Sequence, residues 1–260
     1  MSQPLIEYVT GNTPSWAQET IRNWEKVFTR HGEVDTMQFV IREVFEPMSQ
    51  IDMREVVGQW DHYAGQTWLD AATDPQYKPS KMCDAFRKYD ENPSYYFSGE
   101  LENGICLSSL NGGPWFSDSG GNHRTIVAKF ACERTFGETD IYPQISGVLK
   151  HHYVADLEAL DLFTKLLPFR DQGIHATVER GQMKDSRTSG KHVIDYELAF
   201  FVWDSRFGDD ARSQWLSPQQ FRHFARHVLR RNGQLTRLDR LQHYWLQFGR
   251  NDSGSLIYKN

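Results

Sequence analysis

The stretch Phe116-Ser-Asp-Ser-Gly-Gly-Asn-His-Arg-Thr-Ile-Val-Ala-Lys-Phe130 decides the fold of this chain. It reads as the end of a strand, a tight glycine turn, and a helix whose N-cap is Asn122. The first N–H groups of a helix have no partner within it and favour an anion. His123 and Arg124 stand in this same turn, where positive side chains oppose the helix dipole unless an anion is bound. The stretch therefore predicts a phosphate site, with a plain strand–turn–helix corner as the alternative.

The loop Gly120-Gly121-Asn122-His123-Arg124 resembles the phosphate loop of the ParB/sulfiredoxin superfamily. Sulfiredoxins have Gly-Gly-Cys-His-Arg there, ParB partition proteins Gly-Glu-Arg-Arg, and free-serine kinases Gly-His-Thr-Arg. The similarity covers about residues 105–148 and includes a helix over 122–135 and a strand over 141–148. It implies a ParB/sulfiredoxin-like core whose phosphate-binding residues are Gly120, Gly121, Asn122, His123, Arg124 and Thr125.

Departures from the superfamily pattern narrow what the resemblance implies. Asn122 stands where sulfiredoxins have their catalytic cysteine, so sulfinic-acid reduction is excluded. The two-arginine ParB box is here His123-Arg124, and no helix-turn-helix signature follows it, which disfavours a centromere-binding clamp. The chain is most similar to Osa-type plasmid fertility-inhibition proteins, with the larger FiwA type matching its length. This resemblance implies a nucleotide hydrolase and DNA nuclease of a mobile element that inhibits conjugative transfer through a type IV secretion system.

The chemistry of a bound nucleotide assigns provisional roles to a few side chains. Arg124 would bind phosphate oxygens, and His123 would donate or shuttle a proton. Hydrolysis also needs a divalent ion and a carboxylate that positions water. Asp118 lies beside the loop, and Glu43 and Glu46 belong to an expected strand near it. The expected catalytic residues are His123, Arg124, Glu46 and Asp118, and the expected cofactors are ATP or another NTP with Mg²⁺.

Composition indicates a soluble globular protein of 260 residues, with 39% hydrophobic and 24% charged residues. The 3 cysteines contain no CxxC pair, which favours free thiols in a reducing cytoplasm. There is no signal-peptide pattern and no apolar run long enough to span a bilayer, so cytoplasmic location without membrane insertion is expected. The adjacent His151 and His152 would face different sides of a helix and make a poor metal pair, so no metal-binding residues are predicted.

Positive charge gathers near the C-terminus. Residues 218–260 contain eight Lys or Arg against two Asp, a net +6, which leaves −11 for the rest of a chain of net charge −5. Ser217-Pro218 is a strong helix start. The helix that follows carries a basic face that predicts a DNA contact, with a solvated face as the alternative, formed by Arg222, Arg226, Arg230 and Arg231. A second amphipathic helix is expected over 235–248.

The expected fold class is α/β (α+β) with three parts. Residues 1–34 form an N-terminal helical extension, 35–148 the ParB/sulfiredoxin-like core, and 149–260 a C-terminal α+β extension. Further expected helices span 14–30, 51–63, 80–89 and 156–167, and strands span 36–47, 105–110, 174–180 and 192–204. The resemblance implies that the strand over 105–110 lies beside the strand that ends at the phosphate loop. The last two strands are expected to form a hairpin across the polar turn 181–190.

Two classes of function follow from these observations. The first is the nucleotide-hydrolysing, DNA-cleaving enzyme, with DNA and secretion-system components as partners. The second is a non-catalytic regulatory protein that binds a nucleotide or DNA as a switch. A third reading, a phosphotransferase like the free-serine kinases, needs a small-molecule pocket that the sequence does not reveal. Substitution of Arg124 by alanine separates the first two, because only the enzyme has a turnover to lose.

Overall fold

A computed structural model describes residues 3–28, 34–60, 62–73, 81–98, 104–118, 121–137, 144–206 and 212–234. The chain divides into two compact units, one of residues 1–156 and 182–197, the other of residues 157–181 and 198–260. The boundaries expected after residues 34 and 148 both fall inside the first unit. The mixture of helices with a mixed sheet confirms the α+β class. None of the helices in the described ranges has the length and apolar character needed to cross a membrane.

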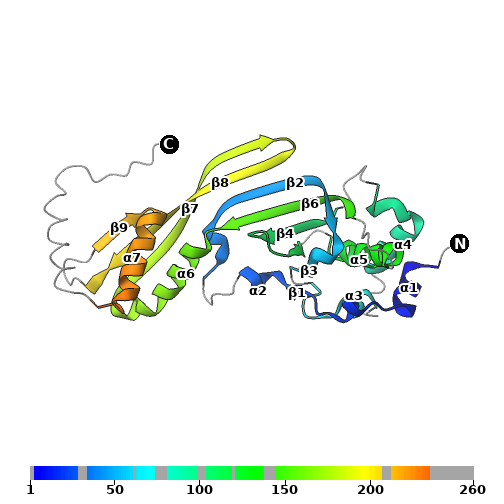
Figure 1. Ribbon diagram of the computed structural model, residues 1–260, viewed down its shortest axis with the longest axis horizontal. Helices are drawn as coiled ribbons and strands as arrows, with labels where there is room; N and C mark the ends of the chain where they lie inside the picture. The colour runs from blue at the N-terminus through cyan, green and yellow to red at the C-terminus, as the bar shows by residue number, and fades with distance from the viewer. Residues whose placement is uncertain are drawn as a thin grey trace. The chain divides into compact units, whose positions relative to one another are not determined.

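The first unit is built on a mixed sheet (Figure 1). Its own strands are β1 (Arg22–Asn23), β2 (Val40–Asp52), β3 (Val56–Gln59), β4 (Cys106–Leu110), β5 (Trp115–Ser117) and β6 (Gln144–Ala155). Their spatial order is β1-β3-β5-β4-β6-β2. Next to β2 lies the end of a long hairpin formed by β7 (Ile174–Thr188) and β8 (Lys191–Asp204). β1, β3 and β5 run parallel, and β4 is antiparallel to β5, so the expected pairing of these last two strands is confirmed.

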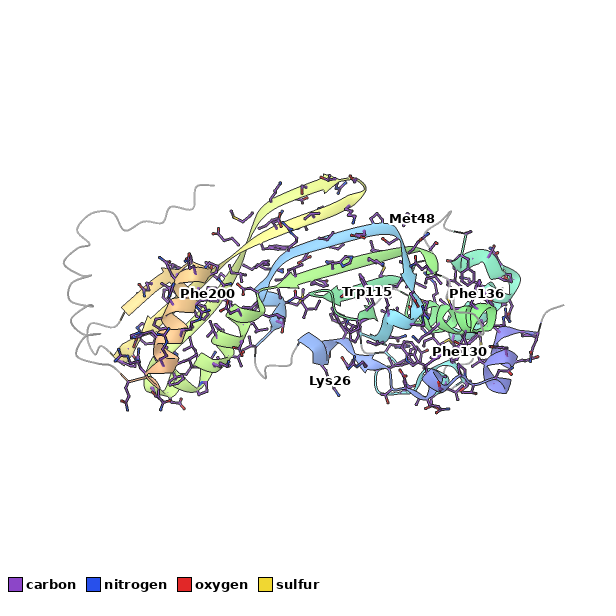
Figure 2. All side chains as sticks on the ribbon, viewed as in Figure 1. Lys26, Met48, Trp115, Phe130, Phe136 and Phe200 are labelled. Carbon is purple, nitrogen blue, oxygen red and sulfur yellow. The ribbon has the colours of Figure 1, made fainter. Side chains whose placement is uncertain are left out.

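Three other helices of the first unit pack against one buried helix, α5. The helices of this unit are α1 (Leu5–Gly11), α2 (Trp24–Phe28), α3 (Trp68–Thr73), α4 (Lys81–Glu91) and α5 (Asn122–Phe136), with 3-10 turns η1 (Ser15–Gln18), η2 (Thr36–Phe39), η3 (Met53–Glu55) and η5 (Pro93–Tyr96). α1, α3 and α4 contact α5. Apolar residues occur on every side of α5, so it is buried all round rather than along one stripe. Phe130, labelled in Figure 2, lies 4.8 Å from Trp16 between ring centroids.

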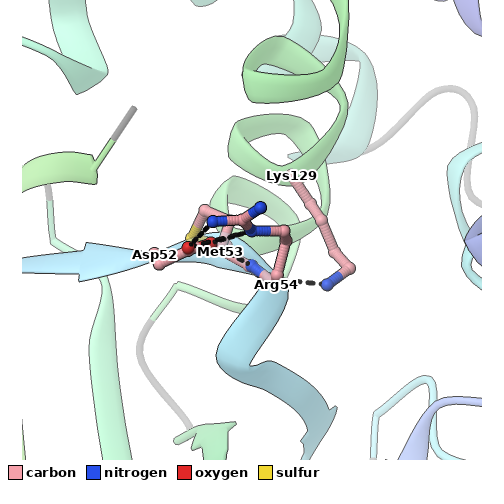
Figure 3. Close-up of polar contacts among 4 residues, drawn as sticks. All are labelled: Asp52, Met53, Arg54 and Lys129. Atoms are coloured by element: carbon pink, nitrogen blue, oxygen red, sulfur yellow. Dashed lines mark hydrogen bonds and ion pairs between the residues drawn. The ribbon is translucent and has the colours of Figure 1, made fainter. Parts of the chain in front are cut away.

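A charged side chain is enclosed in this core. Lys129 of α5 is only 6% exposed, and its Nζ donates to the carbonyls of Met53 at 2.7 Å and Val56 at 2.9 Å. Figure 3 shows it reaching the backbone beside Met53. The ammonium also lies 5.0 Å from the ring centroids of Trp16 and Trp68. Burial lowers the pKa of Lys129 to about 8, although nearby carboxylates act against this.

Two expected helices of the first unit are wrong. The stretch 14–30 forms η1, β1 and the short α2, and the stretch 51–63 forms the end of β2, η3 and β3. Both segments contribute strands that pair with each other, since Arg22 is in register with Gly58. The apolar spacing alone could not distinguish these short strands from helix, because their partner is distant in sequence. The expected helix over 80–89 and the expected strand over 105–110 are confirmed as α4 and β4.

The strand expected to end at Val148 continues to Ala155. His151 and His152 therefore lie within β6 and not at the start of a helix. β6 pairs with β4 on one side and β2 on the other, and this double pairing extends the strand past the expected boundary. Successive strand residues face opposite sides, so the two histidines still point apart, as expected for a poor metal pair.

The second unit packs two helices on a small antiparallel sheet. It consists of α6 (Leu157–Leu166), the 3-10 turn η6 (Leu167–Gln172), residues 174–181 of β7, residues 198–204 of β8, β9 (Arg212–Leu216) and α7 (Pro218–Arg230). Phe200 of β8, labelled in Figure 2, stacks on Phe221 of α7 with 3.9 Å between ring centroids. The expected β7–β8 hairpin and the helix start at Ser217-Pro218, with a capping box, are confirmed. The helix expected over 235–248 lies outside the described residues.

Candidate functional site

The candidate site lies where three parallel strands of the first unit end. Asn23 of β1 is in register with Gln59 of β3, which is in register with Ser117 of β5. Asp118 follows β5, and α5 begins at Asn122. In open α/β sheets, the carboxyl ends of strands with a helix N-terminus beside them are the usual place for a ligand. The strand and the helix that the sequence predicts on either side of this loop are confirmed as β5 and α5.

Gly121 sets where α5 begins. It is the N-cap residue and has φ of +106°, so the N-cap expected at Asn122 is wrong by one position. A Cβ atom on Gly121 would lie 2.6 Å from the carbonyl oxygen of Gly104 and 3.0 Å from Cα of Ile105. The loop thus uses glycine both for a left-handed backbone and for a close approach to the segment before β4. Gly120, the other expected glycine, lies outside the described residues.

A buried polar network attaches the first turn of α5 to the sheet. Ser117 donates to Oδ1 of Asn122 at 2.9 Å, and Nε2 of Gln59 donates to the Asn122 carbonyl at 3.1 Å. The Thr125 hydroxyl lies 3.0 Å from the Gly121 carbonyl and 3.1 Å from Oγ of Ser117. Asn122 and Thr125 are both buried. Their side chains hold the helix start in place, so the phosphate contact expected from the Thr125 hydroxyl does not fit this geometry.

Basic side chains from three separate segments lie near the start of α5. The ring of His123 lies 5.3 Å from that of His62 and 5.5 Å from that of Tyr63. Partial burial, with the positive charges of His62, Lys81 and Arg124, lowers the pKa of His123 to about 4. His123 is therefore a neutral imidazole at pH 7, able to donate or accept one hydrogen bond, within a positive environment.

His62 and Lys81 were not among the site residues predicted from the sequence. His62 follows β3, within a stretch expected to be helical, and Lys81 opens α4. Neither belongs to a local motif, so only the pairing of β3 with β5 and the packing of α4 against α5 bring them to the loop. The signal that could have found His62 is its place just after a strand that runs parallel to β5.

Arg124 is positioned by the backbone opposite. A Cβ atom on Gly104 would overlap Nη1 of Arg124, so the guanidinium lies directly against that glycine. Arg124 is partly exposed and stands one residue beyond His123 in the first turn of α5. A guanidinium in this place can form a two-pronged contact with phosphate oxygens next to the open N–H groups of the helix.

Asp118 is the one of the three expected carboxylates that lies beside the loop. Its N–H donates to the Cys106 carbonyl at 2.9 Å, and its Oδ2 lies 3.5 Å from the hydroxyl of Ser108. Asp118 is partly exposed. It is thus held at the strand end, adjacent to the residues that start α5, where it can contact water or a metal ion carried by a ligand.

Glu46 is not brought to the loop. The register Ser117–Leu107–Lys150–Glu46 places it three strands away, about 14 Å at ordinary strand spacing. Its Oε1 accepts from Lys191 at 2.5 Å. Partial burial raises the pKa of Glu46, but the hydrogen bond and charge of Lys191 outweigh this and leave the pKa below its ordinary value. Glu46 is therefore an ion-paired residue of β2 and does not fit the expected catalytic role.

Glu43, the other carboxylate weighed with Glu46, belongs to a different contact. It is buried, and its Oε2 lies 3.3 Å from Nε2 of His151 on β6. The ring of His151 stacks on that of Phe45 with 3.8 Å between centroids. This pair stabilises the β2–β6 strand pair and is separate from the start of α5.

The expected basic face of α7 exists, but part of it is ion-paired. Nε of Arg222 lies 3.1 Å from Oε2 of Glu158 on α6, and Arg226 pairs with the other oxygen of the same carboxylate. Arg230 and Arg231 are exposed. A polyanion would therefore meet Arg230 and Arg231 directly but would compete with Glu158 for the other two arginines.

The residues at the loop fit an anionic group better than a protein-held metal. Among the described residues, no three His, Cys, Asp or Glu side chains converge as metal ligands. Mg²⁺ is usually held by one or two carboxylates together with substrate phosphates and water, so Asp118 alone would suffice only with the phosphates present. When bound, Mg²⁺ would supply charge neutralisation at the phosphates.

The lowered pKa of His123 predicts an acid-sensitive stability. The unfolded chain binds a proton at an ordinary histidine pKa of 6.5, whereas the folded protein binds it only near pH 4. Between these values the unfolded state holds more protons, so stability falls as pH is lowered from 6.5 to 4. Urea unfolding of wild type and His123→Gln across this window should show a shallower fall in the variant. Equal slopes in the two proteins would contradict the shift.

Comparison of the chain with protein-family models, curated proteins and solved structures yields no match.

Proposed function

We propose that this protein binds a phosphorylated ligand of the nucleotide class at the start of α5, as a regulatory binding protein. The observation that supports it is the convergence of His62, Lys81, His123 and Arg124 at a helix N-terminus opened by a left-handed glycine. Burial and the nearby positive charges both disfavour the protonated form of His123, and an anion bound among these side chains would offset this penalty. Phosphate monoesters carry the charge and acceptor oxygens that guanidinium and backbone N–H groups recognise.

Binding without turnover is the first candidate because one of the catalytic residues expected from the sequence, Glu46, does not lie at the loop. Glu46 lies across the sheet in an ion pair with Lys191. Asp118 remains the one expected carboxylate beside the loop. Phosphoryl chemistry depends on several groups placed together around the reacting phosphate.

The second candidate is the ParB/sulfiredoxin-type nucleotide hydrolase and DNA nuclease of a mobile element. Asp118 and a neutral His123 at the same loop favour it, because a carboxylate and an unprotonated imidazole can each orient an attacking water. The basic face of α7 would then contact DNA through Arg230 and Arg231. Inhibition of conjugation through a type IV secretion system belongs to this second candidate.

The first test is calorimetric titration of the full chain with ATP and with CTP, each with and without Mg²⁺. Arg124→Ala should weaken binding by at least about tenfold, which corresponds to about 1.4 kcal/mol, because it removes a charge-assisted contact to phosphate. The matched control is Arg87→Ala, which removes an exposed arginine of α4 that pairs with Asp84 and Glu91. The control should bind as wild type does.

Phosphate release measured on the same samples separates the two candidates. Turnover by wild type that is lost in both Arg124→Ala and Asp118→Asn would select the hydrolase. Binding without turnover would select the regulatory protein. Absence of binding to either nucleotide, or equal weakening by Arg87→Ala, would reject a specific phosphate site at α5.

A further inference from the structure

A cleft lies between α1, α3 and α4 of the first unit, the three helices that pack on α5 (Figure 1). Its volume is about 420 Å³, which is typical of small-molecule sites. The side chains that line it differ from those at the start of α5, because His62, Lys81, His123 and Arg124 are not among them. The cleft is therefore a second place on the first unit where a ligand can bind.

The floor of the cleft is apolar. It is formed by Met82 and Phe86 of α4, Ala72 of α3 and Ile6 of α1. Met82 and Phe86 are four residues apart, so they share one face of the helix, and they are 3% and 5% exposed. Binding a hydrocarbon group on such a floor is favourable, because it removes apolar surface from water. These four residues, which we call the apolar floor, thus favour an aliphatic chain or an aromatic ring.

The charged side chains at the edge of the cleft are acidic in sum. Arg87, Asp90 and Glu91 of α4 line the cleft. Nη1 of Arg87 donates to Glu91 at 2.9 Å, and its Nη2 donates to Asp84 at 3.3 Å, so two carboxylates face one guanidinium. Asp90 is a third carboxylate, which leaves a net charge of −2 for these four residues at neutral pH. Lys88 is the lysine nearest to them along α4, and it does not line the cleft.

Both carboxylates that line this edge can accept further hydrogen bonds. Oδ1 of Asp90 accepts from the N–H of Leu5 at 2.9 Å, which attaches the start of α1 to the end of α4. Glu91 accepts from Arg87 through Oε1. An ionised carboxylate has about four lone-pair sites on its two oxygens and no donor. An ammonium group supplies three N–H donors and a positive charge, so it complements this edge, whereas a phosphate or a carboxylate is repelled.

We propose that the cleft binds a small organic cation with an apolar body, of the arylalkylamine class. The ring or chain of such a ligand packs on the apolar floor, and its ammonium group donates to Asp90 and Glu91. The proposal does not depend on the phosphate site, since the cleft selects the opposite ligand charge and uses other residues. The two sites can therefore be tested separately on the same chain.

The first test is calorimetric titration of the full chain, at pH 7 and low salt, with 4-phenylbutylamine and with 4-phenylbutyrate. Both probes have a phenyl ring on a four-carbon chain, and they carry opposite charges. The amine should bind at least about tenfold more tightly, because the charges at the edge of the cleft attract it and repel the carboxylate. This preference should shrink as salt is added, since exposed charges are screened.

Cys83 reports whether the amine binds in this cleft. Its thiol lines the cleft and is exposed, whereas Cys106 is partly exposed and Cys132 is buried. Alkylation by iodoacetamide, read peptide by peptide by mass spectrometry, gives the rate at each thiol. The amine, at about ten times its Kd, should slow alkylation of Cys83 by about tenfold, as mass action requires for an occluded thiol. Alkylation of Cys106 should not change.

The double variant Asp90→Asn, Glu91→Gln tests the acidic edge. It removes two negative charges, while the amide oxygens can still accept the hydrogen bonds that the carboxylates accept. Amine binding should weaken by at least about tenfold, and the preference over the carboxylate probe should disappear. The matched control, Asp161→Asn with Glu179→Gln, removes two exposed carboxylates from the second unit and should bind the amine as wild type does.

The comparison of amine with carboxylate uses the wild-type chain, so it remains decisive even if the double variant does not fold. The proposal is overturned if the amine shows no saturable binding, if the two probes bind equally well, or if the amine leaves the alkylation of Cys83 unchanged. It is also overturned if the control variant weakens amine binding as much as the double variant does. A Cys83 alkylation rate that rises on dilution, together with a fall in mass by light scattering, would instead identify a second copy of the chain as the occupant.

Discussion

Replacing Lys129 with alanine is expected to lower the free energy of unfolding by about 3 kcal/mol. The substitution removes the donor of the Met53 and Val56 carbonyls and opens a cavity between Trp16 and Trp68. Leaving buried carbonyls without a donor and deleting buried methylenes each cost energy. Urea unfolding at pH 7 measures the loss.

The matched variant Lys129→Met separates the effect of lost side-chain volume from the effect of the lost charged donor. Methionine fills much of the same space but cannot donate, so we expect a smaller loss than for alanine. Wild type also has a pH signature, because the unfolded lysine titrates at 10.5 and the folded one at about 8. Between these values the unfolded state binds more protons, so Lys129 contributes a rise in stability as pH increases from 8 to 10.5. That contribution should vanish in Lys129→Met, and an unchanged profile would contradict the buried charge.

Gly121→Ala is expected to cost about 3 kcal/mol and to weaken phosphate-ligand binding at α5. Part of the cost is the positive φ of +106°, which an alanine adopts only with strain. The rest is steric, because the new methyl group would lie 2.6 Å from the Gly104 carbonyl oxygen. This clash is relieved only if the start of α5 or the segment before β4 moves. Either movement displaces Arg124 from its position. Denaturant unfolding and nucleotide titration report the two effects.

Gly65→Ala is the control for the backbone part of this cost. Gly65 has φ of +92°, but a Cβ atom there would meet no other atom within 4 Å. The Gly65→Ala protein should lose only the free energy of unfolding that comes from the positive φ, about 1 kcal/mol. It should bind ligand as wild type does. A Gly121→Ala protein as stable as Gly65→Ala, with unchanged binding, would show that the close approach to Gly104 does not position the site.

Local sequence signals identified the elements that depend on nearby residues. The glycine turn before α5, the Ser217-Pro218 start of α7 and the β7–β8 hairpin were all predictable. Each is specified by turn and capping chemistry within a few residues, which the sequence displays directly. The position of His123 and Arg124 in the first turn of α5 was likewise predictable, because both follow directly after the glycine turn.

Tertiary packing decided the features that depend on distant residues. The parallel pairing of β1 and β3 turned expected helices into strands, and the docking of β3 and α4 brought His62 and Lys81 to the loop. Packing also places two residues that the sequence predicts for the site in other contacts. Thr125 is buried against the sheet, and Glu46 pairs with Lys191 across it. A residue's type and spacing determine the contacts it is able to make, but which contact forms depends on strand pairing and burial, because these bring together segments far apart in the chain.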